Sequence, residues 1–542
     1  MVSTHSFKNT LSYFKDPRLL TVFFLGVASG FPWVLIGSAM SGWLKDDGLS
    51  RSSIGLFGLI FVAYSINFLW SPFVDRIRIA VLGRFFGQRR SWILTTQLCI
   101  VLLTYLVSHL NANQDLATMA LFGLLIAIAG ATQDIAIDAY RIDLLQNHDS
   151  NYMTAGSAMA TSGWWTGYAG LGSIPFILVD RPEWNWPAVY LVLSIVMIAL
   201  MITVLLAKEP QAERQAVHAQ IESQYLQGLT GYGPRRLFIL LLLPAIILLI
   251  LYANIGYPYW PAEISQGYQF TSVSLLCFIL LSVFVKLLVD LNRKITRNSE
   301  IENTLYGSPS TVFKAPSHSP LNRLLAWLLT TMVAPIQEFF ERNGSKLAIS
   351  ILLFIFLFKL GEAYLGRMSI VFYREVGFSN TDIAYYSKLI NWGVTIVFSL
   401  IGSIFTIRYG ILKGLFIGGI AMSASNLLFA LMAVVGPNKA LFAFTVLIDG
   451  FTSAWGSVAF VALLSVLCNK SFTASQYALM ASLGTFGRVM LGSYSGVLVD
   501  WLDGNWALFF ILTSVMVVPS LLFLYAIRKP INRLIQNSEL KH

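Results

Sequence analysis

The segment GATQDIAIDAY closes a long apolar run, yet it carries Gln133, Asp134 and Asp138. The two aspartates stand four residues apart, so a helix places them on one face, which Arg141 continues. Two carboxylates on one face repel each other, and burial adds to the cost of charging them. One of them could therefore take up a proton on one side of a membrane and release it on the other. The alternative is that Asp138 pairs with Arg141 and that Asp134 caps a neighbouring helix.

Four more ionisable residues lie inside apolar runs, where charged side chains usually face a cavity or a partner. In FKLGEAY, Lys359 and Glu362 either neutralise each other or form a pair that a substrate or a proton breaks, and Tyr364 closes the segment. In LIDGFTSAWG and GTFGRVMLG, Asp449 and Arg488 also lie near the middle of their runs. Arg488 either binds a substrate carboxylate through two guanidinium nitrogens or pairs with Asp449.

Small and aromatic residues accompany these charges. The first apolar run, GVASGFPWVLIGSAMSGW, contains Gly30, where a small residue lets helices approach closely. Tryptophan rings offer faces on which sugar rings commonly lie, although each could equally serve packing or an interface belt. The candidates are Trp33, Trp164, Trp165 and Trp392, with Asn391 beside the last of them.

The composition is that of a polytopic membrane protein. Of 542 residues, 56% are hydrophobic and 12% are charged, whereas soluble domains carry about a quarter charged residues. The net charge of +10 would suggest nucleic acid in a soluble protein, but here the basic residues fall in alternate loops, so we expect no nucleic-acid partner. The three cysteines show no pairing or metal spacing, and no Walker sequence or nucleophile triad is present. We therefore expect a protein that is not an enzyme and has no cofactor. If it transports a solute, we expect the energy to come from an ion gradient or from the gradient of the solute itself.

The apolar runs predict about fourteen membrane-spanning helices, because a helix needs about 20 apolar residues to cross a bilayer. The expected spans are residues 18–40, 52–72, 92–110, 116–138, 152–179, 187–207, 237–256, 270–291, 346–370, 380–402, 412–435, 440–464, 474–498 and 505–527. Arginines and lysines gather on one side, after the even-numbered spans, and aspartates and glutamates gather on the other. This distribution predicts that both termini are cytoplasmic.

The stretch from 208 to 345 is polar around its two spans, and without it six spans lie on each side. Six plus six spans fit the major facilitator architecture, in which two halves rock about a midplane site. The expected parts are an N-terminal six-helix half (1–207), central cytoplasmic linkers with two extra helices (208–344), a C-terminal six-helix half (345–530) and a cytoplasmic tail (531–542).

The loop SPFVDRIRIAVLGRFFGQRRSW joins the second and third spans and places Asp75 among the arginines Arg76, Arg89 and Arg90. We predict that these residues form a charge latch between adjacent helices, which biases the alternating-access equilibrium. The alternative is that the arginines only set the topology.

Several segments together resemble AmpG-type permeases of the major facilitator superfamily. They are GVASGFP, FLWSPFVDR, FGQRRSW, TQDIAIDAYRIDLL, FKLGEAY and LLSVLCNKSFTASQYALMASLGTFGRV, and they occur in order over most of 18–207 and 335–527. The resemblance places the family's Gln-Asp pair on Gln133 and Asp134, and its first-span glycine on Gly30. Some relatives carry basic residues where Asn67 stands and near Trp165, so anionic groups need not be held in the same place here.

The resemblance implies a bacterial inner-membrane importer of N-acetylglucosaminyl-1,6-anhydro-N-acetylmuramic acid, with or without stem peptide, for peptidoglycan recycling and β-lactamase induction. We expect proton symport through Asp134, Glu362, Asp138 or Asp449, and substrate contacts from Gln133, Trp33, Lys359, Tyr364, Asn391, Trp392, Arg488 and Gly30. The expected partners are this substrate, protons and the lipid bilayer, and the expected state is a monomer. Two alternatives stay open: a transporter of acetyl-CoA or another large organic anion, and a non-transporting sensor or scaffold.

Overall fold

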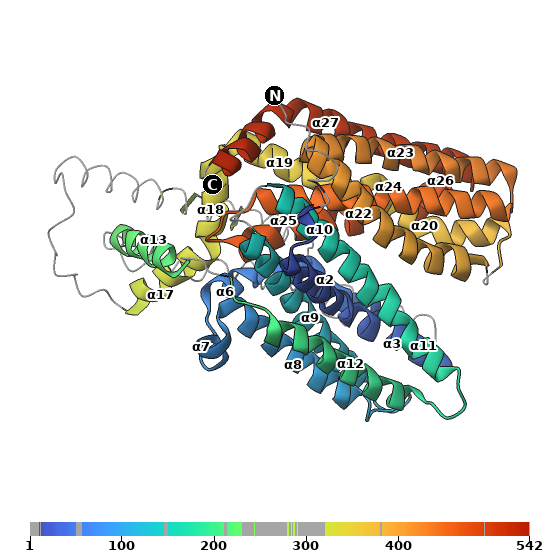
Figure 1. Cartoon of the computed structure of the whole chain (residues 1–542), viewed down its shortest axis with the longest axis horizontal. Helices are drawn as coiled ribbons and strands as arrows, with labels where there is room; N and C mark the ends of the chain where they lie inside the picture. The colour runs from blue at the N-terminus through green and yellow to red at the C-terminus, as the bar shows by residue number, and fades with distance from the viewer. Residues whose placement is uncertain are drawn as a thin grey trace. The chain divides into compact units, whose positions relative to one another are not determined.

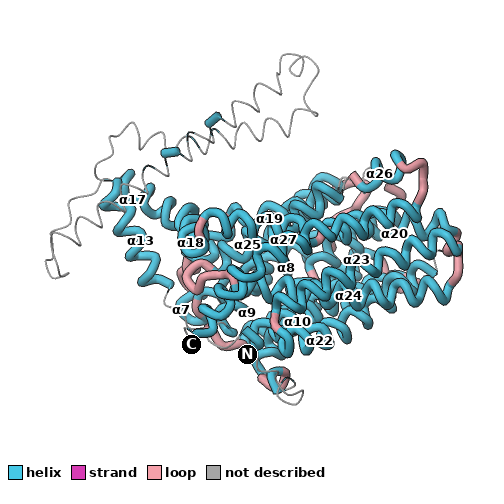
Figure 2. Tube along the Cα trace, turned by 90° about the horizontal axis from the view of Figure 1, so that it is seen from above, coloured by secondary structure: helices cyan, strands magenta, loops and turns pink. Residues whose placement is uncertain are grey.

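Every element in the described part of the chain is helical. The structure is a computed structural model, and it describes residues 10, 12–49, 57–145, 150–210, 214–229, 320–379, 382–492 and 494–540, with isolated positions between 243 and 290. Over these residues Figure 2 shows helices joined by short loops and no strand. The predicted all-α architecture is therefore confirmed.

The chain divides into two units. The first comprises Met1–Ala212 with Phe339–His542, and the second comprises Glu213–Glu338. In the second unit the described helices are α13 (Arg214–Leu229), α17 (Pro320–Leu328), η7 (Leu329–Val333) and the start of α18 (Ala334–Asn343). The predicted central spans 237–256 and 270–291 lie outside the described residues, apart from isolated positions.

The first unit holds two sets of helices, which we call the N-terminal half and the C-terminal half. The N-terminal half contains α2 (Pro17–Gly30), η1 (Val34–Ser38), α3 (Ala39–Asp46), η2 (Gly58–Phe61), α5 (Val62–Ile66), η3 (Asn67–Leu69), α6 (Ser71–Arg76), α7 (Leu82–Phe86), α8 (Gln88–Val107), α9 (Leu116–Leu145), α10 (Ser150–Trp165), η4 (Thr166–Gly170), η5 (Leu171–Ser173), α11 (Ile174–Val179) and α12 (Trp186–Leu206). In Figure 1 these are the blue to green helices.

The C-terminal half is drawn in yellow to red in Figure 1. It contains α19 (Ser345–Phe358), α20 (Leu360–Val376), η8 (Ile383–Ile390), α22 (Asn391–Tyr409), α23 (Ile411–Val435), α24 (Lys439–Val466), α25 (Thr473–Gly492), α26 (Ser495–Trp501) and α27 (Trp506–Leu540). The last helix runs on through Leu540, so most residues that we assigned to a separate tail continue it.

Nine helices among the described residues are long and apolar enough to cross a membrane. They include six of the predicted spans as nearly unbroken helices, such as Gln88–Val107 and Trp186–Leu206. The predicted spans at 52–72, 152–179 and 474–498 are instead divided into shorter helical pieces. The total of fourteen spans and the division into four parts stay predictions.

Side-chain caps explain where several of these helices begin. Asn185 precedes α12 and accepts a hydrogen bond from the backbone N–H of Ala188 at 2.9 Å. Asn438 precedes α24 and accepts one from Leu441 at 3.0 Å. Asparagine and aspartate suit this position because their oxygens satisfy N–H groups that the first turn leaves free.

Glycines allow α2 and α10 to pack with their backbones in contact. A Cβ on Gly30 would lie 2.1 Å from the carbonyl oxygen of Trp164, and a Cβ on Gly163 would lie 2.1 Å from that of Phe23. No side chain fits at such distances, so these positions require glycine. This packing fixes the first and fifth predicted spans against each other.

Candidate functional site

The kink in the first predicted span is the point at which α9 docks. Pro32 has no N–H group, so the carbonyl oxygen of Ala28, four residues earlier, lacks its helical partner. Gln133 of α9 fills that place, because its Nε2 donates a hydrogen bond to Ala28 O at 2.6 Å. Next to it, the hydroxyl of Ser29 donates to the carboxylate of Asp134. The predicted Gln-Asp pair therefore lies against the kink of the first span.

Gln133 has a second polar atom, Oε1, that the contact with Ala28 does not use. Its side chain is fully buried, and its Oε1 has no hydrogen-bond partner among the described residues. The hydroxyl of Tyr64, also buried, is likewise without a partner there. A buried polar group without a partner costs about 1–3 kcal/mol, so such atoms are candidate contacts for water or substrate.

One turn further along α9, Asp138 binds Arg141. Asp138 Oδ1 and Arg141 Nη2 lie 2.9 Å apart, and the side chains are 22% and 1% exposed. The alternative interpretation of Asp138 as an ion-pair partner thus describes its contact correctly. The role of Asp138 in proton coupling stays a prediction.

Trp33 lies within an aromatic cluster. The centroids of Phe61 and Tyr64 are 4.7 and 4.8 Å from that of Trp33, and those of Trp164 and Tyr168 are 5.7 and 6.5 Å away. Protein rings therefore occupy much of the surface that we proposed for sugar stacking. Gly30 likewise contacts the Trp164 backbone rather than an open space.

A second polar cluster lies in the C-terminal half, where α19 gives way to α20. Lys359 sits at this break, and its Nζ lies 3.3 Å from Glu362 Oε2 and donates to Ser457 Oγ at 2.7 Å. The hydroxyl of Ser453 donates to the other oxygen of Glu362. The predicted Lys359–Glu362 pair is present, and two serines of α24 hold it.

Asp449 and Arg488 are near this cluster but do not form the ion pair that we considered. Asp449 accepts a hydrogen bond from Ser425 Oγ at 3.1 Å. Arg488 is exposed, and the described residues give it no ion pair. Its charge lies close enough to Glu362 to act on that carboxylate, although the two side chains form no ion pair in the described residues.

Asn391 and Trp392 begin α22 and each carries a polar atom without a partner among the described residues. Trp392 packs against Gly170 of the N-terminal half, where a Cβ would lie 2.9 Å from its ring. Tyr364 is half-buried and packs against the apolar core around Phe372. Trp392 thus lies at the boundary between the halves, and Tyr364 lies at the edge of an apolar core.

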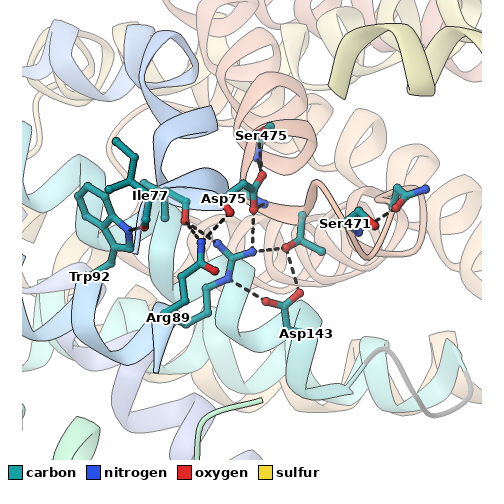
Figure 3. Close-up of polar contacts among 12 residues, drawn as sticks. Asp75, Ile77, Arg89, Trp92, Asp143, Ser471 and Ser475 are labelled. Carbon is teal, nitrogen blue, oxygen red and sulfur yellow. Dashed lines mark hydrogen bonds and ion pairs between the residues drawn. The ribbon is translucent and has the colours of Figure 1, made fainter. Parts of the chain in front are cut away.

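Arg89 is the centre of a buried ion-pair cluster that joins the two halves (Figure 3). Its Nε lies 2.8 Å from Asp143 Oδ2, and its Nη2 lies 2.7 Å from Asp75 Oδ1 and 2.6 Å from Thr473 Oγ1. Its Nη1 donates to the Val74 carbonyl at 3.2 Å. The Arg89 side chain is 0% exposed, so every one of these charges is shielded from water.

Asp75 also caps the first helical turn of α25, which belongs to the opposite half. Its Oδ1 accepts from the N–H of Ala474 at 3.1 Å, and its Oδ2 accepts from the N–H and the hydroxyl of Ser475 at 2.7 and 2.6 Å. A carboxylate at this end satisfies free N–H groups and the positive end of the helix dipole. We call the end of the molecule where Asp75, Arg89 and Asp143 lie the Arg89 end.

The other predicted latch residues have different contacts. Arg90 donates from its Nε to the Val204 carbonyl at the end of α12, at 2.9 Å. Arg76 ends α6 beside Asp75 and is half-buried. Of the four residues, Asp75 and Arg89 thus form the ion pair, while Arg90 connects α8 to α12 within the N-terminal half.

Sequence reasoning missed the residues that complete this cluster. They are Asp143, Thr473, Ser475 and Glu209, the last of which accepts from the N–H groups of Arg89 and Arg90 at 2.8 and 3.1 Å. Thr473 and Ser475 stand in FTASQYAL, a helix-start pattern of hydroxyl residues before an apolar run, which could have indicated an N-terminus. No sequence pattern indicates that these two hydroxyl groups contact Asp143 and Asp75.

No group of three or more histidine, cysteine, aspartate or glutamate side chains in the described ranges could hold a metal ion. The charged and hydroxyl groups described above are carboxylates, two buried arginines, a lysine and the serine and threonine hydroxyls that contact them.

Comparison with known proteins decides the family. A family model described as Major Facilitator Superfamily matches residues 22–302, just over half of the chain. The chain belongs to the Major Facilitator Superfamily. As a facilitator it is a multi-pass membrane protein and a transporter of small molecules rather than an enzyme, as the sequence predicts.

Solved facilitator structures share the fold. The proton:xylose symporter XylE, bound to 6-bromo-6-deoxy-D-glucose, has a TM-score of 0.54 at 13% identity and covers 94% of each chain. A double-tryptophan mutant of XylE has a TM-score of 0.57 at 12% identity and covers 97% of this facilitator and 98% of that chain. At such identities the likeness concerns the fold alone.

Curated relatives of this facilitator confirm the resemblance to AmpG-type permeases. A Rickettsia felis protein with the provisional name transporter AmpG 4 is 26% identical over 519 residues, which are 96% of this chain and 98% of that protein. The anhydromuropeptide permease of Escherichia coli strain K12 is 27% identical over 521 residues, which are 96% of this chain and 81% of that protein.

Proposed function

We propose that this facilitator is a proton-coupled importer of anhydro-muropeptides that works by alternating access. It would carry N-acetylglucosaminyl-1,6-anhydro-N-acetylmuramic acid, with or without stem peptide, from periplasm to cytoplasm for peptidoglycan recycling. The observation that carries the proposal is the similarity to the anhydromuropeptide permease over 96% of this chain. The protein would act as a monomer in the bacterial inner membrane, with both termini and the Arg89 end on the cytoplasmic side.

The substrate would meet residues of both halves. Gln133 Oε1, Asn391 Oδ1 and Trp392 Nε1 are two acceptors and one donor without partners among the described residues. The N-acetyl groups of the sugars offer matching N–H and C=O groups, so these atoms would form hydrogen bonds with them. Arg488 would bind a carboxylate of the muramic acid or of the peptide, because its guanidinium is exposed and forms no ion pair in the described part of the chain.

Asp134 would carry the proton on α9. It is held by the hydroxyl of Ser29 at the kink of the first span, without a cation in hydrogen-bond contact in the described part of the chain. Glu362, in contrast, already has Lys359 at 3.3 Å, so its proton would enter only when a substrate carboxylate takes over that lysine. Protonation and substrate binding would then favour the same change of state.

The Arg89 cluster would act as the cytoplasmic latch. It links Asp75, Arg89 and Asp143 of the N-terminal half to Thr473 and Ser475 of the C-terminal half. All these contacts would have to break when the cytoplasmic side opens. Water would hydrate the separated charges and offset part of the lost contacts, so the net bias toward the closed side is smaller than the about 3–5 kcal/mol that deletion of one partner of a buried ion pair costs.

The deciding experiment is uptake of labelled anhydro-muropeptide into proteoliposomes, with and without an inward proton gradient. Saturable uptake that the gradient accelerates is the expected result. Saturable uptake independent of the gradient would keep the substrate and reject the proton coupling. Absence of saturable uptake under both conditions, with the purified protein still folded, would reject the function and favour a sensor or scaffold.

The transport of acetyl-CoA or another large anion is less well supported. Such a substrate needs several free cations, but Lys359 is paired with Glu362, and Arg141 with Asp138. Arg89 is paired with two aspartates. Competition by acetyl-CoA in the same uptake assay tests this alternative directly.

A further inference from the structure

Arg141 connects the acidic residues of α9 to the opposite half. Its Nη2 lies 2.9 Å from Asp138 Oδ1, while its Nη1 donates to Ser157 of α10 at 3.1 Å and to Ser465 of α24 at 3.0 Å. Asp138 and Ser157 belong to the N-terminal half, whereas Ser465 belongs to the C-terminal half. One guanidinium thus joins Asp138, which the sequence predicts as a candidate for proton coupling, to a contact between the two halves.

The two serines are oriented as acceptors for this cation. Ser157 donates its own hydroxyl proton to the Met153 carbonyl at 2.7 Å, and Ser465 donates to the Val461 carbonyl at 2.7 Å. Their lone pairs therefore point away from these helices and toward Arg141. The donor of the Ser465 hydrogen bond is charged, which makes this bond stronger than one between neutral groups.

The surroundings leave Asp138 as the counter-ion of Arg141. The titratable groups near Asp138 are Asp134 and Arg141 on α9, Cys468 after α24, and Tyr477 on α25, whose hydroxyl is hydrogen-bonded to the Asp138 carboxyl. The Tyr477 ring lies 5.5 Å from the guanidinium carbon and also belongs to the opposite half. If Asp138 loses its charge, Arg141 becomes a buried cation without a counter-ion, which is a strongly unfavourable arrangement.

We infer that Arg141 is the positioning residue that couples the charge of Asp138 to closure of the Arg89 end. An ionised Asp138 holds Arg141 against Ser465 and Tyr477 and keeps the end closed. A protonated Asp138 releases the guanidinium, which then favours a hydrated state in which the halves have separated. This inference rests on the proposed proton-coupled import, for which it supplies the step from proton to gate.

The test measures opening without any substrate. In a Cys99→Ser, Cys277→Ser and Cys468→Ala background, a Ser482→Cys substitution supplies a single reactive thiol. Ser482 is 3% exposed and donates to Asn67 of the opposite half at 2.6 Å, so a thiol there is covered while the halves are closed. The rate of alkylation by N-ethylmaleimide in proteoliposomes reports how often this interface opens.

Arg141 and its partners offer a matched set of variants. We expect Ser465→Ala and Asp138→Asn to raise the alkylation rate about tenfold, because each removes one link of the chain from charge to closure. Ser157→Ala removes the same type of bond from the same nitrogen, but within one half, and should leave the rate within about twofold of the parent. Arg141→Gln should match Ser465→Ala or exceed it.

Two outcomes overturn the inference. Equal rates for Ser157→Ala and Ser465→Ala mean that Arg141 only packs against its neighbours, and an unchanged rate for Asp138→Asn means that the carboxylate does not control closure. The melting midpoint of each variant in detergent shows whether faster alkylation comes from opening or from misfolding. If Arg141→Gln fails to fold, the milder Ser465→Ala variant still tests the inference. Because alkylation needs no muropeptide, a failure of uptake with the expected alkylation pattern rejects the substrate and not the coupling residue.

Discussion

Gln133, in the fourth predicted span, donates a hydrogen bond to the carbonyl oxygen of Ala28, in the first, at 2.6 Å. Pro32, which lacks an N–H group, is the reason that this oxygen is available. Proline and glutamine thus form a matched pair, in which one breaks a helical hydrogen bond and the other replaces it. The neighbouring Asp134 is held at the same kink by Ser29.

This pairing predicts a thermodynamic coupling between Gln133 and Pro32. Gln133→Leu should destabilise the protein by about 1–3 kcal/mol, because it leaves the Ala28 oxygen buried without a partner. In the Gln133→Leu background, Pro32→Ala should recover part of that loss, since alanine supplies an N–H to Ala28. Melting midpoints of the two single variants and the double variant in detergent measure the effect. Simple additivity of the two losses would show that the carbonyl is satisfied in another way.

The neutral variant Asp134→Asn should separate folding from transport. The asparagine oxygen can still accept the Ser29 hydrogen bond, so we expect the melting midpoint and the surface level to stay close to those of the parent. Uptake driven by an inward proton gradient should be lost, because the amide cannot exchange a proton. Ser29→Ala is the matched control, since it removes the hydrogen bond and keeps the carboxyl. Gradient-driven uptake that persists in Asp134→Asn would remove this residue from the mechanism.

Asp75 should control closure of the Arg89 end. Asp75→Asn replaces one of the two carboxylate oxygens by an NH₂ group, so the one oxygen that remains cannot accept from Arg89, Ala474 and Ser475 together, and the charge that pairs with Arg89 is lost. We expect uptake to fall at least about tenfold while substrate still binds. The reason is that the substitution destabilises the state in which the Arg89 end is closed.

Ser475→Ala provides the graded comparison for Asp75. It removes only the hydroxyl bond and leaves both backbone N–H groups to the carboxylate, so its effect should be clearly smaller. Initial uptake rates and ligand-induced shifts of the melting midpoint measure the two properties separately. If both variants reduce uptake equally, the capping of α25 by Asp75 is not what holds the halves together.

The sequence was informative wherever a residue conflicted with its local surroundings. Asp134, Lys359 and Glu362 stood out because charges are rare in apolar runs, and the structure gives each of them specific partners. Asp75 and Arg89 stood out for another reason, because an acidic residue among the arginines of a loop suggested an ion pair, and the structure contains that pair. Periodicity and length sufficed for α8, α12 and α23, which lie within a few residues of their predicted bounds.

Contacts between distant segments could not be inferred in this way. Thr473 lies 384 residues from Arg89 in the sequence and 330 from Asp143, and a hydroxyl residue carries no local sign that it will face a cation. Trp33 was expected to offer a free face, but its four aromatic neighbours come from segments whose approach depends on the packing of the whole half. Local patterns identify the unusual residue, and only the fold supplies its partner.

The Lys359–Glu362 pair should respond to the substrate carboxylate. Lys359→Met removes the cation that contacts Glu362 and leaves the Ser453 hydrogen bond and the more distant charge of Arg488, so a substrate carboxylate would meet a site with one positive charge fewer. We expect KM for uptake to rise at least about tenfold, with a smaller change in maximal rate. Ser457→Ala keeps the ion pair and removes one bond to Lys359, so its KM should stay near the parent value. An unchanged KM in Lys359→Met would mean that the lysine serves structure alone.

Gly30 should be required for packing rather than for substrate contact. A Cβ at this position would lie 2.1 Å from the Trp164 carbonyl oxygen, so Gly30→Ala forces α2 and α10 apart and should destabilise the protein by about 1–3 kcal/mol. Gly366, in α20, has no atom within 4 Å of its added Cβ, and Gly366→Ala should stabilise its helix by about 0.5–1 kcal/mol. Melting midpoints and uptake KM together decide between the two roles. A Gly30→Ala variant with a normal midpoint and a raised KM would return Gly30 to the substrate site, because a packing residue must affect stability first.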